Sequence, residues 1–150
     1  MIGMVTKSIF FDTAKVAKAV SNSTRKVLSK FGAFVRTTAR HSIRKRKAVS
    51  QPGQPPSSHV GLLKKLIYFG YDKLRRSVVI GPTALHGAEA PPLLEYGGRT
   101  RVKSRTRLRQ GYAGQEGRNV MATYRPRPFM GPAFEREKPK LPAMWANSIR

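Results

Sequence analysis

A long stretch without proline constrains the fold of this chain more than any other feature of its sequence. Residues 12–47 contain no proline and one glycine, Gly32, so nothing in the backbone prevents a continuous helix. Asp12 is placed to cap its first turn. The expected helix would be about 50 Å long at 1.5 Å per residue. Because that length exceeds the core of a small domain, we expect one end to contact a partner. The apolar residues that recur at helical spacing along it are Val16, Val20, Val27, Phe31, Phe34 and Val35.

Shorter elements are predicted after this helix. A loop rich in proline at 51–59 precedes a helical turn opening 61–67. Runs of β-branched and aromatic residues at 66–71 and 77–80 then predict a hairpin that ends at Gly81 and Pro82. Residues 92–96 predict a short helix, and 120–124 a third strand. A C-terminal helix is expected from 133 to 137, with Pro139 and Pro142 interrupting the remainder of the chain.

These elements together predict an α+β fold, in which a long N-terminal helix packs on a small antiparallel sheet and a helical segment ends the chain. The length of 150 residues suits one domain over 1–150 with a modest core of its own. The segment at about 98–119 is rich in arginine and glycine, and we expect it to form an inserted basic hairpin or arm.

The net charge points to an acidic partner. Thirty Lys and Arg residues against seven Asp and Glu residues give a formal charge of +23. Such an excess favours a polyanion or a strongly acidic protein surface as the neighbour. Taken alone, it is typical of a nucleic-acid-binding protein of ribosomal or nucleoid type. Seven phenylalanines argue against a chain that is disordered throughout.

A row of alternating cations, called the comb below, lies inside the predicted arm. In a helix these side chains would spread around the whole circumference. In an extended strand they would share one face, about 6.8 Å apart at 3.4 Å per residue. That spacing is similar to the separation of phosphates along an extended nucleic-acid strand. Like charges on one face need solvent or an anionic surface opposite them, so we expect contact with DNA or an acidic partner. The comb consists of Arg99, Arg101, Lys103, Arg105, Arg107 and Arg109.

A second basic cluster falls in the last turns of the predicted long helix. Cations are favoured at a helix C-terminus by the negative end of the helix dipole. The cluster therefore suits a solvated helix end as well as a contact with DNA or an acidic partner. Its members are Arg44, Lys45, Arg46 and Lys47.

The chain offers little for catalysis or for cofactor binding. Its histidines, His41, His59 and His86, lack metal-ligand spacing. We find no phosphate-binding glycine loop, and the scattered acids form no acid–base or two-metal pair. No apolar run approaches the roughly 18 residues that a membrane span needs. We expect a soluble intracellular protein with no enzymatic activity, cofactor, metal or membrane contact.

Four short motifs come after the long helix in order. They are the segment at 61–67, the strand end at 78–82, the segment at 90–97 and the turn at 127–133. Together with the helix they resemble the tail-completion or head–tail joining (neck) proteins of long-tailed bacteriophages, a family of small tail components in lambdoid phages. The resemblance covers roughly residues 12–138. The stretch between the last two motifs is longer than is usual in the family, and the comb lies within it. The best-matching residues are Glu95, Tyr96, Gly97, Arg127, Pro128, Phe129 and Pro132.

The resemblance implies a structural virion protein, made in the host bacterial cytoplasm, that forms a ring at the phage head–tail junction. Such a ring would join the portal or connector side to the tail. The expected partners are copies of the chain itself, neighbouring neck, portal or adaptor and tail proteins, and packaged double-stranded DNA. The alternative is a basic nucleic-acid-binding protein of ribosomal or nucleoid type.

The motif residues themselves indicate scaffold rather than a binding site. Glu95 is one of few carboxylates in the chain, and we expect it to pair with an arginine such as Arg127. Gly97 permits backbone conformations that are closed to other residues. Pro128 and Pro132 bracket Phe129 and would fix it as an apolar anchor where the last helix begins.

Overall fold

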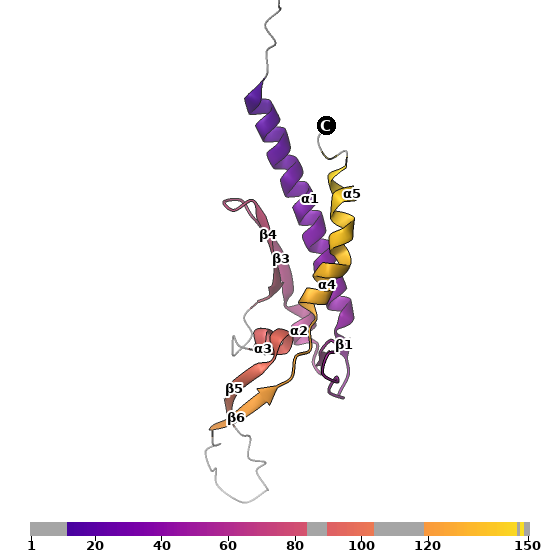
Figure 1. Ribbon diagram of the computed structural model, residues 1–150, viewed down its shortest axis with the longest axis vertical. Coiled ribbons are helices and arrows are strands. Elements are labelled where there is room, and N and C mark those ends of the chain that lie inside the picture. The colour runs from indigo at the N-terminus through magenta and orange to yellow at the C-terminus, as the bar shows by residue number, and fades with distance from the viewer. Residues whose placement is uncertain (1–11, 84–89, 104–118, 147, 149–150) are drawn as a thin grey trace, which may run out of the picture.

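The long helix α1 is the axis of the molecule (Figure 1). The computed structural model describes residues 12–83, 90–103, 119–146 and 148. In it, α1 spans Thr13–Ser42. Asp12 caps the helix as expected, because its Oδ1 accepts a hydrogen bond of 3.0 Å from the backbone N–H of Lys15. The first turns of α1 extend past the end of the C-terminal helices (Figure 1) and leave Val16 and Val20 exposed.

The expected helix end at residue 47 is wrong. The helix stops at Ser42, and Ile43 takes an extended conformation with φ −80° and ψ 115°. The side chain of Ile43 is buried in the core, and the extended backbone suits its branched Cβ. The next residues form β1 (Arg44–Lys45), which pairs in parallel with β2 (Ser57–Ser58). Because the helix ends at Ser42, the four consecutive cations at 44–47 do not share one helical turn, where like charges would repel one another.

The hairpin predicted after the loop is confirmed. Strands β3 (Ile67–Asp72) and β4 (Ser77–Pro82) are antiparallel, and Gly81 and Pro82 are the last two residues of β4. One face of the hairpin packs on α1 at Gly32. A Cβ added there would lie 2.7 Å from Val78 Cγ2 and 3.0 Å from Phe69 Cδ2. The single glycine of α1 is therefore the point where the hairpin approaches the helix.

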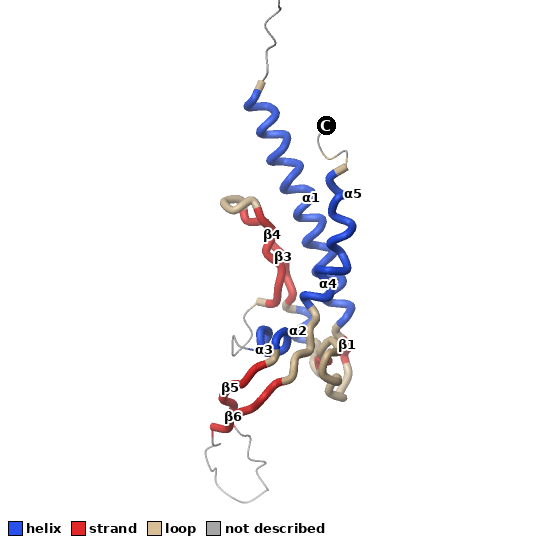
Figure 2. Tube along the Cα trace, viewed as in Figure 1, coloured by secondary structure: helices blue, strands red, loops and turns tan. Residues whose placement is uncertain are grey.

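Short elements connect this hairpin to the end of the chain. Helix α2 (Leu62–Lys65) precedes β3, and α3 (Ala90–Tyr96) precedes a second hairpin of β5 (Gly98–Lys103) and β6 (Asn119–Tyr124). Strand β6 pairs with β5 and not with β3 or β4. Within the described ranges the strands thus form three separate two-stranded sheets (Figure 2). The α+β expectation is confirmed.

The C-terminal segment runs along α1 as three helical pieces: α4 (Met130–Glu137), the 3₁₀ helix η1 (Lys138–Lys140) and α5 (Leu141–Trp145) (Figure 1). Pro139 and Pro142 lie in the first turns of η1 and α5, where a missing N–H leaves no helical bond unmade. Phe31 of α1 and Phe134 of α4 meet edge to face, with ring centroids 5.7 Å apart.

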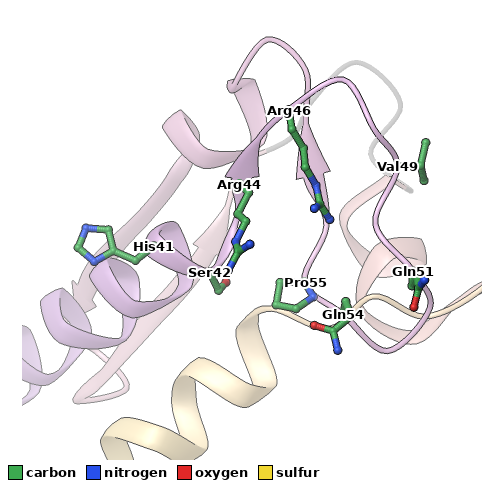
Figure 3. Close-up of a pocket in the computed structure, with 8 residues that line it drawn as sticks. All are labelled: His41, Ser42, Arg44, Arg46, Val49, Gln51, Gln54 and Pro55. Carbon is green, nitrogen blue, oxygen red and sulfur yellow. The ribbon is translucent and has the colours of Figure 1, made fainter.

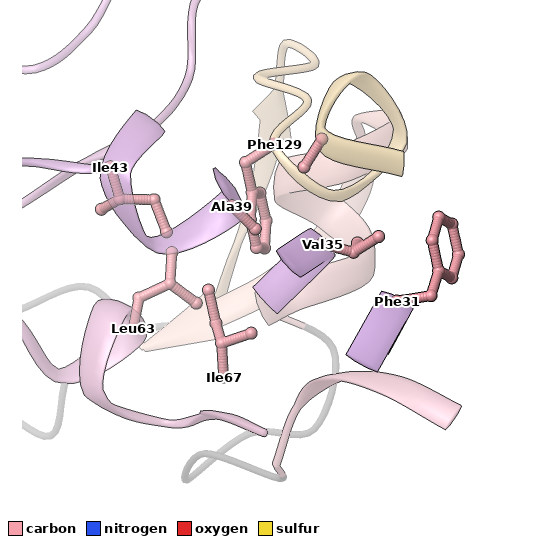
Figure 4. Close-up of a cluster of buried hydrophobic side chains, with 8 residues drawn as sticks. Phe31, Val35, Ala39, Ile43, Leu63, Ile67 and Phe129 are labelled. Atoms are coloured by element: carbon pink, nitrogen blue, oxygen red, sulfur yellow. The ribbon is translucent and has the colours of Figure 1, made fainter. Parts of the chain in front are cut away.

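The core lies where the C-terminal half of α1 meets α2, the start of β3 and the start of α4 (Figure 4). The predicted apolar stripe of α1 continues beyond Val35 to Ala39 and to Ile43, which follows the helix. Phe129 closes the core from the α4 side and is 1% exposed, which confirms it as the apolar anchor. The buried cluster consists of Phe31, Val35, Ala39, Ile43, Leu63, Ile67, Phe129 and Ala133.

Candidate polyanion-binding interface

The two halves of the family-like signature, at 95–97 and 127–132, meet in space through one carboxylate. Glu95 Oε2 accepts hydrogen bonds from the backbone N–H groups of Phe129 (2.9 Å) and Met130 (3.0 Å), and Oε1 accepts one from Gly131 (2.7 Å). These donors form the first turn of α4, which has no side-chain cap of its own. A carboxylate is favoured there because it satisfies free N–H groups and faces the positive end of the helix dipole.

The expected ion pair between Glu95 and Arg127 is therefore wrong. The N-cap position of α4 is held by Phe129 and not by a Ser, Thr, Asp or Asn, so the carboxylate of Glu95 accepts the hydrogen bonds of its first backbone N–H groups instead. The guanidinium of Arg127 turns to the other side, where its Nε donates to the carbonyl oxygen of Ser50 at 2.9 Å. The backbone N–H of Arg127 donates to the carbonyl oxygen of Leu94 at 2.6 Å, which fixes the two chain segments together.

Gly97 occupies the crossing point of these segments. Its φ is +75°, and an added Cβ would lie 2.9 Å from the carbonyl oxygen of Tyr124 and 3.0 Å from Pro126 Cδ. Both the left-handed backbone and the close approach require glycine. Tyr96 beside it is largely exposed, whereas Pro128 is partly covered and Pro132 lines a groove next to Phe129. The signature residues are thus mostly structural, as expected.

The first half of the comb forms an extended strand. Arg99, Arg101 and Lys103 lie on β5 opposite Thr123, Met121 and Asn119 of β6. The side chains of Arg99 and Arg101 therefore share one face of the β5–β6 ribbon. Arg99 and Arg101 are exposed, while Thr100 and Val102 between them are partly covered. The strand expected for this part of the comb is confirmed. Arg105, Arg107 and Arg109 lie outside the described residues.

The opposite face of the ribbon is apolar. Apart from Thr100, it carries the apolar or aromatic residues Val102, Val120, Ala122 and Tyr124, which alternate with the cationic positions. Val120 is 48% exposed. A two-stranded ribbon gains little stability alone in water, so this combination of one basic and one apolar face suits a strand pair that lies against another surface.

A pocket opens at the corner where α1 gives way to β1 (Figure 3). This corner pocket has a volume of about 590 Å³. Arg44 and Arg46 extend from one side of the β1 segment toward the loop that carries Gln54, as Figure 3 shows. Lys45, between them on the strand, does not line the pocket. The lining residues are His41, Ser42, Arg44, Arg46, Val49, Gln51, Gln54 and Pro55.

The loop that forms the far wall of the corner pocket is held by hydrogen bonds at three points. Ser57 Oγ donates to the carbonyl oxygen of Ala48 at 2.6 Å. The backbone N–H of Gly53 donates to the carbonyl oxygen of Pro126 at 2.9 Å. Arg127 Nε donates to the carbonyl oxygen of Ser50, which lies in the sequence between Ala48 and Gly53. Sequence reasoning identified this stretch as a loop but gave no sign that it folds back beside β1, so His41, Gln51 and Gln54 were not predicted as part of a site.

The ribbon and the corner pocket belong to the same end of the molecule, opposite the first turn of α1 (Figure 1). The connection from β6 to α4 contacts the pocket loop through Pro126 and Arg127, and Arg125 is exposed on it. The structure therefore brings the described members of the two predicted basic groups to one end. Lys47 is exposed nearby but does not line the pocket.

The carboxylates of the described residues are all engaged within the chain. Asp12 and Asp72 accept local hydrogen bonds, from Lys15 and from Leu74 respectively. Glu95 caps α4. Glu135 pairs with Lys138 at 3.6 Å. The remaining described carboxylate is Glu137, whereas Glu89 and Glu116 lie outside the described ranges.

Glu137 is buried, 3% exposed, on the side of α4 that faces α1. Lys140 Nζ donates to it at 2.7 Å, and so does Thr38 Oγ1. The hydrogen bonds from Lys140 and then from Thr38 hold the pKa of this carboxyl below its ordinary value of 4.5, against the opposing effect of burial. Among the ion pairs of the described residues, none involves Arg44, Arg46, Arg99 or Arg101.

Within the described residues, no group of three His, Cys, Asp or Glu side chains is placed to hold a metal ion. No helix in those ranges is both long and apolar enough to cross a membrane. Comparisons with known protein families, with curated proteins and with solved structures find no match to this chain.

Proposed function

We propose that this chain is a structural subunit of the head–tail junction of a tailed bacteriophage, assembled as a ring that joins the portal or connector side to the tail. It would act without catalysis. Its basic end would contact packaged DNA or acidic faces of neighbouring portal, adaptor or tail proteins. The family resemblance, carried by ordered motifs from α1 to α4, is the reason for choosing this setting.

The single observation that carries the interface is the engagement of the described carboxylates inside the protomer. Arg44, Arg46, Arg99 and Arg101 lie at one end with no ion-pair partner in the described part of the chain. The described carboxylates of a second copy are engaged in the same way, so they would not compensate this end. Like charges gathered at one end of a molecule are stabilised by an anionic surface from another molecule.

A different surface suits contact between copies. Strands β3 and β4 contain no lysine or arginine, and Asp72 is their only charged residue. The backbone N–H of Thr83 donates to the carbonyl oxygen of Leu66, so these two residues face each other as a hydrogen-bonded pair. Hydrogen-bonded and non-hydrogen-bonded pairs alternate from there along the antiparallel ladder. The backbone groups of Val78 and Ile80 therefore point away from β3.

That outer edge of β4 pairs with no strand of the described residues. An uncharged edge strand is a site where another strand can add. In a chain of +23, this is also where two copies would approach with least repulsion. Addition of the β4 edge of one copy to the β3 edge of the next is a head-to-tail contact, and such contacts generate rings when the rotation closes.

The proposal is tested by the mass of the full-length protein in solution, measured by gel filtration with light scattering at low and high salt, with and without duplex DNA. We expect a closed multimer. Val79 is exposed on the outer face of β4 and Leu74 is exposed in the hairpin turn. Val79→Lys should reduce assembly, because a lysine on an edge strand opposes strand addition. Leu74→Lys adds the same charge outside the strands and should leave assembly unchanged.

A second function, a nucleic-acid-binding module of ribosomal or nucleoid type, is favoured by the ribbon cations Arg99 and Arg101, which have no ion-pair partner among the described residues. A protein that stays monomeric under all these conditions and binds free duplex DNA or RNA tightly would support this second function and contradict the ring. A protein that forms rings, or co-assembles with a portal or tail tube, would support the neck.

A further inference from the structure

We propose that the corner pocket is a binding site for a phosphate group, presented with its attached sugar by a nucleic-acid backbone. This deepens the proposed polyanion contact and rests on that function only for the source of the phosphate. The pocket lies at the junction of α1 and β1, separate from the ribbon, and the resemblance to neck proteins assigns it no role.

The first argument is the direction of the two arginines. Residues that alternate along an extended segment point to the same side, and Arg44 and Arg46 both line the corner pocket (Figure 3). Each guanidinium presents a planar fork of N–H donors that matches two oxygens of a phosphate. Two such forks on one wall supply more donors than a single carboxylate can accept.

The second argument is the chemistry of the other walls. Gln51 and Gln54 add neutral amide donors, and His41 adds an imidazole. The lining contains no carboxylate. One acidic residue, Glu137, lines an adjoining groove together with His41 and Arg136. Its carboxylate is held by Thr38 and Lys140, so it is not available to neutralise the two arginines.

The third argument is that the loop is fixed before any ligand arrives. Its bonds to Pro126, to Arg127 and between Ser57 and Ala48 hold the wall that carries Gln51 and Gln54. A wall that is already ordered loses little conformational entropy on binding. The donors are therefore presented to an anion at low entropic cost.

The volume favours a sugar–phosphate unit over an acidic side chain. Pockets that enclose small ligands typically have volumes of about 300–1,000 Å³, and the corner pocket falls in that range at about 590 Å³. A lone carboxylate would leave most of this space and several donors unused. A phosphodiester with its sugar would fill this space and accept hydrogen bonds from these donors. An acidic peptide is thus the less favoured occupant, and it is one outcome of the test.

The test measures binding of inorganic phosphate and of a short duplex DNA to the full-length protein by calorimetry. Three variants are compared, Arg44→Gln, Arg46→Gln and Lys45→Gln. Each removes one exposed positive charge from adjacent positions of the same segment, but Lys45 does not line the pocket. We expect the two arginine variants to weaken binding at least about tenfold, the loss of one charge-assisted hydrogen bond. Lys45→Gln should change it by about twofold or less, as for a screened surface charge.

Equal weakening by all three variants would show a general charge effect and overturn the pocket. So would failure of both probes to bind, or tighter binding of an acidic peptide than of duplex DNA. Pocket-dependent binding of DNA identifies the nucleic-acid backbone as the source, and pocket-dependent binding of inorganic phosphate alone identifies a free phosphate. Unfolding midpoints confirm that each variant is folded.

Light scattering on the same variants separates the two proposals. A protein that forms rings but binds phosphate and DNA equally well with or without Arg44 and Arg46 contradicts the corner pocket alone. Phosphate binding that depends on Arg44 and Arg46 in a protein that never forms a ring contradicts the neck proposal alone.

Discussion

At the scale of single residues, Glu95 accepts more backbone hydrogen bonds than any other carboxylate of the described residues. It accepts three backbone hydrogen bonds at the start of α4. Glu95→Ala leaves those donors unsatisfied and should lower the free energy of unfolding by about 2–3 kcal/mol. Glu95→Gln keeps one acceptor oxygen and should lower it by less. Denaturant unfolding monitored by circular dichroism measures both changes.

Glu135→Ala provides the control for Glu95. The Glu135 side chain is 67% exposed and contacts only Lys138 through a weak pair, so its removal should change stability by no more than about 0.5 kcal/mol. Equal effects of Glu95→Ala and Glu135→Ala would contradict the capping role.

Gly97 gives a second test at this scale. Gly97 and Gly53 have nearly the same φ, +75° and +79°, but a Cβ at Gly97 meets backbone at 2.9 Å while a Cβ at Gly53 meets nothing within 4 Å. Gly53→Ala should cost about 1 kcal/mol of left-handed strain. Gly97→Ala adds the collision with Tyr124 and Pro126 and should cost more, about 2–4 kcal/mol. Thermal unfolding compares the two, and equal losses would refute the close approach.

At the scale of elements, the contact between α1 and the β3–β4 hairpin depends on Gly32. In an exposed helix interior, Gly→Ala stabilises by about 1 kcal/mol. At Gly32 the same substitution should destabilise the protein, because the added methyl group collides with Val78 and Phe69. Overpacking of this kind costs about 1–3 kcal/mol. Gly70→Ala, in β3 with open space around it, is the control and should be tolerated. Stabilisation by Gly32→Ala, seen as a higher unfolding midpoint, would show that helix and hairpin are not closely packed.

The contact between α1 and α4 should depend on pH through Glu137. Its pKa is lowered in the folded protein, chiefly by the hydrogen bonds from Lys140 and Thr38. The folded state therefore binds this proton less readily than the unfolded state. The resulting stability is fully present above the ordinary pKa of 4.5 and is lost as the pH falls through the lower folded value.

Glu137→Gln should remove this part of the acid sensitivity, so that its unfolding midpoint falls less steeply below pH 4.5 than that of the unsubstituted protein. Glu135→Gln, on the exposed side of α4, should keep the original profile. Parallel profiles for all three proteins would contradict the assigned role of Glu137.

Most elements could be predicted because their signals are local. The N-cap at Asp12, the apolar stripe of α1 and the β-branched runs of β3 and β4 each depend on neighbouring residues. The end of α1 was missed because burial of Ile43 and the pairing of Arg44 with Ser57 are tertiary events. The partner of Glu95 was missed for the same reason, since backbone donors at α4 leave no trace in side-chain chemistry.

At the scale of the whole molecule, the basic end should dominate any contact with DNA. Each phosphate contact contributes about 0.9 to the slope of log K against log salt. Replacing Arg99 and Arg101 together by Gln should therefore reduce that slope by up to about 1.8. Replacing Arg25 and Lys26 by Gln removes the same charge from exposed positions of α1 and should leave the slope nearly unchanged. Fluorescence titrations over a salt series decide between the two, and equal slopes for both variants would contradict a localised interface.

The site was only partly predictable at this scale. Alternation in the sequence was enough to place Arg99 and Arg101 on one face of a strand. The corner pocket was not predictable, because it needs α1 to end early and a distant loop to be fixed by Pro126 and Arg127. Composition indicated an acidic partner but carried no information about which cations would gather at one end.

The Glu95 cap has a consequence for how such a protein can change over time. The chain leaves the body at Gly97 and returns at Pro126. Beside these points, Arg127 N–H donates to the carbonyl oxygen of Leu94 and Glu95 holds the start of α4, and neither contact involves a residue of the β5–β6 ribbon. The β5–β6 ribbon should therefore be replaceable without loss of the contacts that hold the rest of the fold. Its length and charge can be rewritten, by selection or in the laboratory as a display site, while the body that carries it keeps its fold.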